Sequence, residues 1–580
     1  MKKAKNLLLN KSLFYIAFGL MMLEIAGAIN YMIDGIVTSR WLDETAMAAN
    51  GITGPIFAIL SIFSGVFASG FQNIAGIQLG EGHSDVAKNT WRITWVFALF
   101  VSSAMMVVGL IFSDGIASLL GAPVSMMKLH TDSAAYIRGF MIGAVPYIFS
   151  ALFIPALQIN GKNKLITVSV IALSAVDILG DFANVFIFHG GMFGMGLATS
   201  LSYFVSAAIL FSGLLDRNAF MDMHLARYGS AERGTLRRIL LQGLPKATKR
   251  VCNTLRPIFI NRFTLAAAGE AAMVAMSVEG NTRFILESPG IGISGAALML
   301  VGIFLGEMDY RSLREMQKKC QILIWGGVGL LGLIYFLLAE PLTRLYISPD
   351  SQSFAMTVTV LRCHAVSLPF LAFNEYYFAC FQGMGKLVVT HMFTAMQRFV
   401  CIVALSYGLQ SLFGIDGIWY AIPLSEVLVS ILVLVGAKLI IPLEKLKKPD
   451  FYGDISQSLF SEEEIPAFLD SVDAFFTEYG IEERNARYVR LFIEEIGSIV
   501  LSKGFEDGKA HQLDVRILYT KEGLSIRTKD DCLTLSDIEC SDKSIGTPED
   551  PLLGLHMVFT LAKNVQYTNT MNMNHLLIHL

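Results

Sequence analysis

Long apolar stretches recur about twelve times before residue 443, and they constrain the fold more than any other feature of the sequence. Each is close to the ~20 residues that a helix needs to cross the hydrocarbon core of a bilayer. Hydrophobic residues make up 54% of the chain and charged residues 16%, a balance typical of polytopic membrane proteins. We predict about twelve transmembrane helices, at residues 13–38, 50–72, 93–113, 138–158, 165–189, 192–214, 244–266, 272–302, 321–346, 357–381, 388–411 and 417–441.

Lysine and arginine gather in alternate connections between these stretches. Connections that face the cytoplasm carry an excess of basic residues, so this set is predicted to be cytoplasmic. An even number of spans then places both termini, and the C-terminal tail, in the cytoplasm, and we expect the protein in the plasma membrane. The basic connections include Lys88, Arg92, Lys162, Lys164, Arg237, Arg238, Lys249, Arg250, Lys318 and Lys319.

An internal repeat divides the membrane part. The segment LGEGHSDVAKN at Leu79 matches LGEMDYRSLRE at Leu305, and ETAMAANG at Glu44 matches EAAMVAMS at Glu270. Both pairs have the same separation along the chain, which we call the repeat offset. Two further pairs, NGKNKL with QGMGKL and GMFGMGLATSLS with GIDGIWYAIPLS, have nearly the same separation. Six predicted helices separate equivalent points, so both halves have the same orientation. We predict two six-helix lobes, residues 1–226 and 227–443, around a midplane cavity.

Ionisable residues at bilayer depth are costly and indicate function. In the first half, Asp177 and Asp181 lie at positions i and i+4 on one face of the fifth predicted helix, and Asp34 lies on the first. Two carboxylates that close repel each other when both are ionised, so one should bind a proton or both should share a cation. Alternatively, Asp34 or Asp181 caps a helix or pairs with a polar neighbour.

In the second half, Glu279, Arg283 and Glu287 follow one another at steps of one helical turn, which favours salt bridges within one helix. Glu375 and Glu426 have no partner near them in sequence, and we interpret them as cavity residues that favour cationic substrates. The position that corresponds to Asp34 at the repeat offset is Ile260, so the coupling site is expected in the first half alone.

Several motifs in order resemble the multidrug and toxic compound extrusion (MATE) transporters: INYMIDGIVTSRWLDETAMAANGITGPI, LGEGHSDVAK, LQINGKNK and GDFANVFIFHGGMFGMGLATSLS. The resemblance covers roughly residues 10–442. It implies export driven by inward flow of H⁺ or Na⁺. Asp34 matches an acidic residue on the first helix of many members, and Asp181 matches an Asp on the fifth. Asp177 stands where Asn is more usual, which leaves the coupling ion open.

The chain changes character after the last apolar stretch. Residues 450–580 hold 23 acidic and 11 basic residues, whereas the preceding residues hold 25 acidic and 34 basic. Residues 444–453, with a basic run and a proline, are predicted to be a linker, and 454–580 a cytoplasmic α/β sandwich domain. We predict helices at 463–479, 485–503 and 552–565, and strands within HQLDVRILYT, GLSIRTK and HLLIHL.

The order of these elements resembles the GHKL-type ATP-binding domain, closest to anti-sigma-factor kinases. Glu495 matches the family's catalytic Glu, but Ile499 stands where its Mg²⁺-binding Asn is expected. Asp530 or Asp531 matches the adenine-reading Asp, and Gly554 is what remains of the glycine-rich box. Isoleucine has no oxygen for a cation that requires oxygen ligands. We therefore expect a degenerate domain that binds ATP weakly or not at all and regulates transport or docks a cytoplasmic regulatory protein; the alternative is a folded cap.

These features favour a secondary exporter of small, cationic amphiphilic molecules, with no enzymatic activity, no required cofactor or metal, and no nucleic-acid partner. The seven cysteines show no metal-ligand spacing. Two other readings are a lipid-linked oligosaccharide flippase, whose cavity would be more cationic, and a membrane sensor with a kinase-like signalling tail. The acids of the first half favour the exporter, and Ile499 counts against the sensor.

Overall fold

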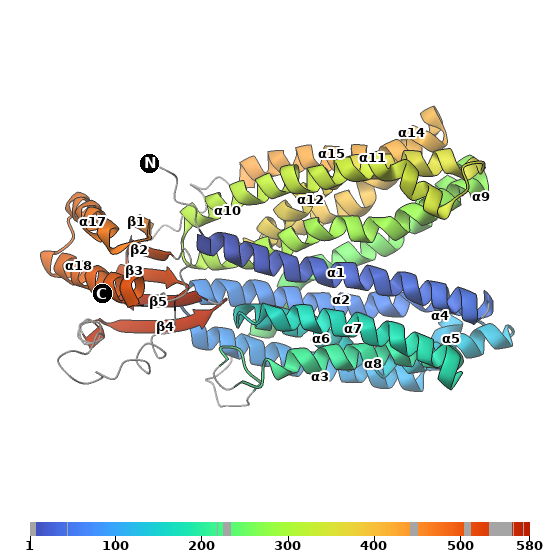
Figure 1. Ribbon diagram of the computed structural model, residues 1–580, viewed down its shortest axis with the longest axis horizontal. Coiled ribbons are helices and arrows are strands. Elements are labelled where there is room, and N and C mark those ends of the chain that lie inside the picture. The colour runs from blue at the N-terminus through green and yellow to red at the C-terminus, as the bar shows by residue number, and fades with distance from the viewer. Residues whose placement is uncertain are drawn as a thin grey trace. The chain divides into compact units, whose positions relative to one another are not determined.

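The computed structural model describes residues 7–42, 44–216, 219–223, 234–440, 451–503, 512–532, 559–560, 562–571 and 573–580. The chain forms two compact units, which are described separately (Figure 1). The larger, helical unit consists of Tyr15–Gln158 and Asn163–Pro442, and the smaller consists of Leu443–Leu580 with Met1–Phe14 and Ile159–Lys162.

The first half of the chain forms eight α-helices in the described residues, most of them apolar along their whole length. They are α1 (Leu7–Trp41), α2 (Glu44–Gly80), α3 (Ser84–Ile111), α4 (Ser113–Leu120), α5 (Met127–Met141), α6 (Ala144–Ile159), α7 (Asn163–Ala183) and α8 (Gly191–Ser212). A π-helical turn, η1 (Asn184–Phe188), extends α7. Helix α4 ends at Gly121, whose φ of 111° lies in the left-handed region that glycine tolerates best.

The second half begins with a helix far too long for one span. Helix α9 (Thr235–Gly306) has 72 residues, which at about 1.5 Å per residue would exceed three bilayer cores. It is interrupted at Ala268 and Gly269, whose φ and ψ are not helical. The remaining elements are α10 (Tyr310–Ile322), η2 (Leu323–Val328), α11 (Gly329–Tyr346), α12 (Gln352–Gly383), α13 (Leu387–Ala395), η3 (Met396–Val400), α14 (Cys401–Phe413) and α15 (Ile415–Ile440).

Ten helices in the described residues are long and apolar enough to cross a membrane, or eleven if the bent pair α5 and α6 forms one span. The prediction of a polytopic helical protein is therefore confirmed. The seventh and eighth predicted spans both fall within α9, on either side of its interruption, and the fourth falls on the bent pair. A count of twelve depends on taking the two segments of α9 as separate spans.

Helices pack mainly within their own half. In the first half α7 packs on α8, and α5 on both α8 and α2; in the second, α14 and α12 pack on α15, and α11 on α12. Figure 1 shows α3, α7 and α8 on the side of α2, and α11, α12, α14 and α15 on the side of α9. The most extensive contact between the halves joins α2 to α9.

The contact between α2 and α9 is reciprocal. A Cβ at Gly80 would overlap the carbonyl oxygen of Ile303, and a Cβ at Gly306 would overlap that of Ile77. Gly80 and Gly306 correspond to each other at the repeat offset, as do Ile77 and Ile303. Each half thus presents the same glycine to the same carbonyl of the other, at backbone contact distance. The glycines are required because any side chain would separate the helices.

A second pair of contacts repeats this pattern. A Cβ at Gly76 would lie 3.0 Å from the carbonyl oxygen of Met299, and one at Gly302 would lie 3.2 Å from that of Asn73. The repeat offset again relates Gly76 to Gly302 and Asn73 to Met299. The two contacts have the form of an interface between equivalent surfaces, which is what a duplicated unit produces.

The tail forms a five-stranded antiparallel sheet in the order β1-β2-β3-β5-β4. Its elements are β1 (Phe451–Leu459), η4 (Glu462–Glu464), α17 (Ile465–Tyr479), α18 (Glu483–Ser498), η5 (Ile499–Lys503), β2 (Leu513–Thr520), β3 (Gly523–Asp530), β4 (Asn564–Thr570) and β5 (Met573–His579). One aliphatic row crosses all five strands in register, formed by Ile455, Ile517, Ile526, Ile578 and Val565. Phe468, Phe492 and Ile496 of α17 and α18 pack in the same hydrophobic core.

The sequence predicted part of this domain correctly. The first two predicted helices correspond to α17 and to α18 with η5, and the predicted strands correspond to β2, β3 and β5. Strands β1 and β4 were not predicted, and the prediction of helix at Asn564 and Val565 is wrong because β4 begins there. Residues 451–453, predicted to be linker, belong to β1. Most of the third predicted helix lies outside the described residues.

Candidate functional site

The first half holds a group of three aspartates and one asparagine that we call the acidic cluster: Asn30 and Asp34 of α1, and Asp177 and Asp181 of α7. Asp34 is half-buried and the other three are buried. The spacing of about one helical turn puts the two α7 carboxylates on one helix face, and their side chains are 3% and 0% exposed. The carboxyls of Asp34 and Asp181 lie within hydrogen-bonding reach of each other. The structure therefore brings together all three of the predicted coupling acids.

The polar neighbours of the cluster leave several of its oxygens unsatisfied. Thr199 and Ser202 of α8 lie beside Asp177, but their hydroxyls donate to the backbone carbonyls of Met195 and Thr199. Buried oxygens without a hydrogen-bond partner among the described residues belong to Asn30, Asp34, Thr38, Asp177 and Asp181, the last with both of its carboxylate oxygens. Neither Asp34 nor Asp181 lies in the first turn of its helix, where it could cap free N–H groups.

No salt bridge joins the three aspartates of the acidic cluster to a lysine or arginine in the described chain. Buried carboxylates without partners are strongly disfavoured, and adjacent ones also repel each other. A proton shared between the carboxyls of Asp34 and Asp181 would relieve both effects, and so would a bound cation. The cluster has the chemistry of a site for a proton or a small cation.

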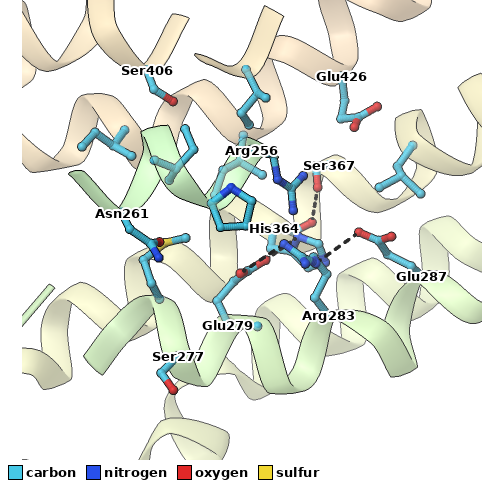
Figure 2. A pocket seen from close by; sticks show the side chains of 18 of the residues that line it. Arg256, Asn261, Ser277, Glu279, Arg283, Glu287, His364, Ser367, Ser406 and Glu426 are labelled. Atoms are coloured by element: carbon cyan, nitrogen blue, oxygen red, sulfur yellow. Dashed lines mark hydrogen bonds and ion pairs between the residues drawn. The ribbon is translucent and has the colours of Figure 1, made fainter. Parts of the chain in front are cut away.

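The second half encloses a cavity of about 310 Å³, called here the second-half cavity. Its walls come from both segments of α9 and from α12, η3, α14 and α15. Figure 2 shows that charged and polar side chains gather around it, among them Arg256, Glu279, Arg283, Glu287, His364 and Glu426.

The predicted ion pairs along α9 are present. Arg283 lies 3.8 Å from Oε2 of Glu279 and 3.7 Å from Oε1 of Glu287. Nδ1 of His364 lies 3.4 Å from Oε1 of Glu279, on the other side of the same carboxylate. Glu287 is also 3.4 Å from the guanidinium of Arg398 of η3, so the ion pairs extend between helices.

Glu375, one of the two predicted cavity carboxylates, is paired twice. Its Oε2 accepts from Nζ of Lys249 at 2.8 Å, and its Oε1 accepts from Arg398. It is absent from the residues that line the cavity. Lys249, which the sequence analysis assigned to a cytoplasmic connection, lies within α9. The structure thus places a compensated carboxylate behind the cavity wall.

Glu426, the other predicted cavity carboxylate, does line the cavity. Its Oε2 accepts hydrogen bonds from Nδ2 of Asn374 at 2.9 Å and from Nε2 of Gln397 at 2.8 Å. It forms no salt bridge with any cation of the described residues. Two neutral amides therefore hold this carboxylate in place without cancelling its charge.

Three residues of this site, Arg256, Asn374 and Gln397, are not among those that the sequence patterns indicate. Arg256 could have been found, because it is an ionisable residue inside the seventh predicted span. The amides carry no charge and show no distinctive spacing, so only the fold reveals them.

The internal repeat relates the two sites. At the repeat offset, Arg256 corresponds to Asn30 and Ile260 to Asp34, and both Arg256 and Ile260 line the second-half cavity. Glu426 corresponds in the same way to Tyr203 of α8, because the separation between these two residues equals that between the GMFGMG and GIDGIW segments. The part of the cavity wall that contains Arg256 and Ile260 therefore corresponds to the α1 side of the acidic cluster.

The residues predicted for a degenerate nucleotide site lie in the tail. Glu495 is half-buried on α18, and Ile499 is 3% exposed and packs in the hydrophobic core. Oδ1 of Asp530, at the end of β3, accepts from Nδ2 of Asn574 at 2.7 Å and from the backbone N–H of Cys532 at 3.1 Å. Burial raises the pKa of this carboxyl, and these hydrogen bonds lower it only in part. Asp531 follows it, partly buried, and Gly554 lies outside the described residues.

The fold and its buried polar sites define a polytopic membrane transporter. The MatE family model matches residues 20–183 and again residues 245–408, which together are more than half of the chain. The chain therefore belongs to the MATE family, and its fold is that of a multidrug exporter. The starting points of the two matches are separated by nearly the repeat offset.

Curated relatives match across most of the membrane part. An uncharacterized transporter, YisQ of Bacillus subtilis, is 21% identical over 396 residues, covering 67% of this chain and 85% of that protein. The multidrug export protein MepA of Staphylococcus aureus is 21% identical, covering 70% of this chain and 88% of that protein.

Solved structures share the fold at low identity. A multidrug resistance MATE family transporter of the MOP superfamily, in an outward-facing conformation, has a TM-score of 0.70 and is 20% identical. A MOP superfamily transporter from Pyrococcus furiosus, described by a reverse polarity of its binding pocket, has a TM-score of 0.67 and is also 20% identical. Each match covers 77% of this chain and all of the other.

Proposed function

We propose that this protein is a secondary active exporter of the plasma membrane, in which inward movement of H⁺ or Na⁺ drives efflux of small molecules. The acidic cluster carries the proposal. Asp34, Asp177 and Asp181 lie together, each with at least one buried and unsatisfied carboxylate oxygen, and without a basic partner in the described chain. Such a site binds a proton or cation when it is accessible and releases it when its surroundings change.

The mechanism we propose is alternating access by two six-helix lobes, with twelve spans in all. The reciprocal contacts of Gly80 and Gly306 support it, because they place a symmetry relation at the joint between the halves. The interruption of α9 supports counting its two segments as separate spans. Rocking of one lobe against the other would then expose the cavity to each side in turn.

For substrates, we propose small amphiphilic molecules with a cationic group. The names of several relatives refer to multidrug resistance or multidrug export. Glu426 offers such a group a carboxylate that forms no salt bridge in the described residues, while Glu375 holds Lys249 and Arg398 in position behind the wall.

We propose that the tail is a cytoplasmic regulatory domain without catalytic activity, which docks a protein partner. Ile499 supports this, because its side chain is part of the hydrophobic core and offers no ligand to Mg²⁺. Purified full-length protein should hydrolyse no ATP in the presence of Mg²⁺. Turnover that disappears in the Glu495→Ala variant would contradict this part of the proposal.

The test of export uses purified protein in proteoliposomes loaded with ethidium. Efflux is followed under a pH gradient or a sodium gradient, for the full chain and for a chain truncated after Lys448. We expect one of the two gradients to drive efflux by both the full and the truncated chain, since the acidic cluster lies wholly in the membrane part. If neither gradient moves the dye, the exporter proposal is wrong.

A further inference from the structure

The charges around the second-half cavity compensate one another with two exceptions. A chain of contacts joins acids and bases alternately through α9, α12 and η3. It runs from Lys249 to Glu375, Arg398, Glu287, Arg283 and Glu279. Three bases and three acids are neutralised in this way. Among the described residues that line the cavity, Arg256 and Glu426 are charged side chains without a salt bridge. Arg398 acts on Glu426 electrostatically, but it is already paired with Glu287 and Glu375.

Arg256 lines the cavity, and its guanidinium makes no hydrogen bond or ion pair with any residue that the structure describes. The acids that act on it electrostatically are Glu279 and Glu287, and both are already paired with Arg283. A guanidinium presents five N–H donors in a planar fork that suits a carboxylate or phosphate. At this place it is suited to an anionic group supplied by a ligand.

Glu426 offers the opposite charge to the same cavity. Beside it, Oε1 of Gln397 is buried and has no hydrogen-bond partner among the described residues, while its Nε2 donates to Glu426. Gln397 is 2% exposed and lines the cavity. An ammonium group has several donors, so it could give one to the Glu426 carboxylate and another to the Gln397 oxygen. The pair is an acceptor site for a protonated amine.

The rest of the wall favours a ligand with an apolar body. Ile260, Ile402 and Ile418 line the cavity and belong to the hydrophobic cluster around Trp419. His364 and Ser406 also line it, and Nε2 of His364 and Oγ of Ser406 are buried without a hydrogen-bond partner in the described residues. Apolar walls with a few placed polar groups are typical of small-molecule sites.

We propose that the second-half cavity binds an amphoteric small molecule, with an anionic group at Arg256 and a protonated amine at Glu426 and Gln397. This rests on the proposed function, in which the cavity belongs to the transport path, and it narrows the cationic substrate class given there. A ligand with a positive charge alone leaves the Arg256 guanidinium unpaired. A ligand with a negative charge alone leaves the Glu426 carboxylate unpaired.

Three fluorescent probes with the same dansyl group and a similar chain test this. Nε-dansyl-lysine carries an amine and a carboxylate, dansylcadaverine carries the amine alone, and 6-(dansylamino)hexanoate carries the carboxylate alone. Binding is measured by dansyl fluorescence on full-length protein in detergent, with no ion gradient. We expect Nε-dansyl-lysine to bind about tenfold to a hundredfold more tightly than either other probe, since each charge-assisted hydrogen bond adds such a factor.

Two variants assign each charged group of the ligand to its binding residue. Arg256→Gln should weaken Nε-dansyl-lysine by about tenfold or more and leave dansylcadaverine unchanged. Glu426→Gln should weaken both amine-bearing probes and leave 6-(dansylamino)hexanoate unchanged. Arg262→Gln and Glu270→Gln remove exposed charges of α9 outside the cavity and serve as matched controls. A variant that binds all three probes equally weakly would have a folding defect, which size-exclusion profiles detect. In that case Arg256→Lys, which keeps the positive charge, replaces Arg256→Gln as the test.

The proposal is overturned if dansylcadaverine binds as tightly as Nε-dansyl-lysine, or if Arg256→Gln and Arg256→Lys bind every probe like the original protein. Efflux of the same probes from proteoliposomes is measured separately. Selective binding without efflux under any gradient would contradict the exporter and leave the amphoteric site standing. Efflux without selectivity among the probes would support the exporter and contradict the amphoteric site.

Discussion

The acidic cluster and the second-half cavity share corresponding positions of the sequence repeat, yet their electrostatics are opposite. In the first half, three carboxylates share a buried space with no basic partner in the described chain. In the second, three acids and three bases pair through a continuous chain of contacts. At the positions related by the repeat offset, Asn30 is replaced by Arg256 and Asp34 by Ile260.

This difference separates two tasks. A site without compensating charge depends on an ion from outside, and its state changes whenever that ion leaves. A compensated network keeps its geometry with or without an ion, because removing either partner would leave a buried charge. The first half is thus suited to energy coupling and the second to a cavity of constant shape.

The largest effect is expected in the first half. Asp34→Asn and Asp181→Asn should each reduce gradient-driven ethidium efflux by about a hundredfold or more, since an amide neither ionises nor releases a proton. The fold should persist, because neutralising an unpaired buried carboxylate removes an electrostatic penalty. The measurement is proteoliposome efflux, combined with thermal unfolding of the purified variants.

Asp350→Asn, which neutralises an exposed aspartate, is the matched control for these variants. Normal efflux in both cluster variants would refute the coupling site. A large fall in the unfolding temperature would instead give the acids a structural role.

The second half should respond in the opposite sense. Arg398→Gln leaves Glu287 and Glu375 short of a partner, so we expect a loss of about 3–5 kcal/mol in stability, as for other broken buried ion pairs. Chemical denaturation of the purified protein measures it. Arg311→Gln, which breaks an exposed pair with Glu315, should change stability by about 1 kcal/mol or less. Equal effects of the two variants would remove the contrast between the halves.

Asp177 sharpens the comparison within the acidic cluster. Asp177→Asn keeps the shape of the side chain and leaves the Asp34 and Asp181 pair intact. We expect a fall in efflux of less than about tenfold, equivalent to about 1.4 kcal/mol. The number of coupling ions per substrate, measured as the gradient at which net transport stops, should decrease if Asp177 carries one of them. An unchanged number would assign the ion to Asp34 and Asp181 alone.

The smallest effect is expected in the tail, where a buried carboxylate does have donors. Burial raises the pKa of Asp530. A raised pKa in the folded state means that the stabilising contribution is complete below the usual value of about 4 and is lost as pH rises through the folded value. Asp530→Asn should abolish this dependence of stability on pH. At pH 7 it should stabilise β3 and β5 against the opening that permits hydrogen exchange by about 1 kcal/mol or less, because an amide oxygen accepts the same two hydrogen bonds.

Hydrogen exchange of these amides in the full-length protein, compared between pH 4 and pH 8, measures this. Greater loss of protection in Asp530→Asn than in the original protein at pH 7 would show that the ionised carboxylate is needed.

The sequence predicts residues whose chemistry is unusual for their surroundings. Asp34, Asp177 and Asp181 are conspicuous because charges are rare in apolar helices, and the spacing of the last two already places them on one face. The pairing of Arg283 with Glu279 and Glu287 follows from helix periodicity in the same way. These predictions need only local geometry.

Contacts between distant segments escape this reasoning. Arg398 meets Glu287, and Lys249 meets Glu375, although more than a hundred positions separate the partners of each pair in the sequence. The sequence predicts the seventh and eighth spans as two separate helices, and nothing in their composition indicates that they are the two segments of one interrupted helix. Strand β1 was missed because its polar residues are only partly buried, which weakens the alternation that marks a strand.

The glycine contacts between α2 and α9 give the membrane part the kind of interface that two copies of one chain form in a symmetric dimer, within a single polypeptide. Gly80 meets Ile303 as Gly306 meets Ile77, so the surface that joins the halves is complementary to itself. A six-helix ancestor would have needed only two copies of one chain to form it. After fusion the two copies could mutate independently, so that one could keep acids without basic partners while the other acquired an ion-pair network. If so, residues 1–226 and 227–580 expressed as separate chains should assemble in the membrane.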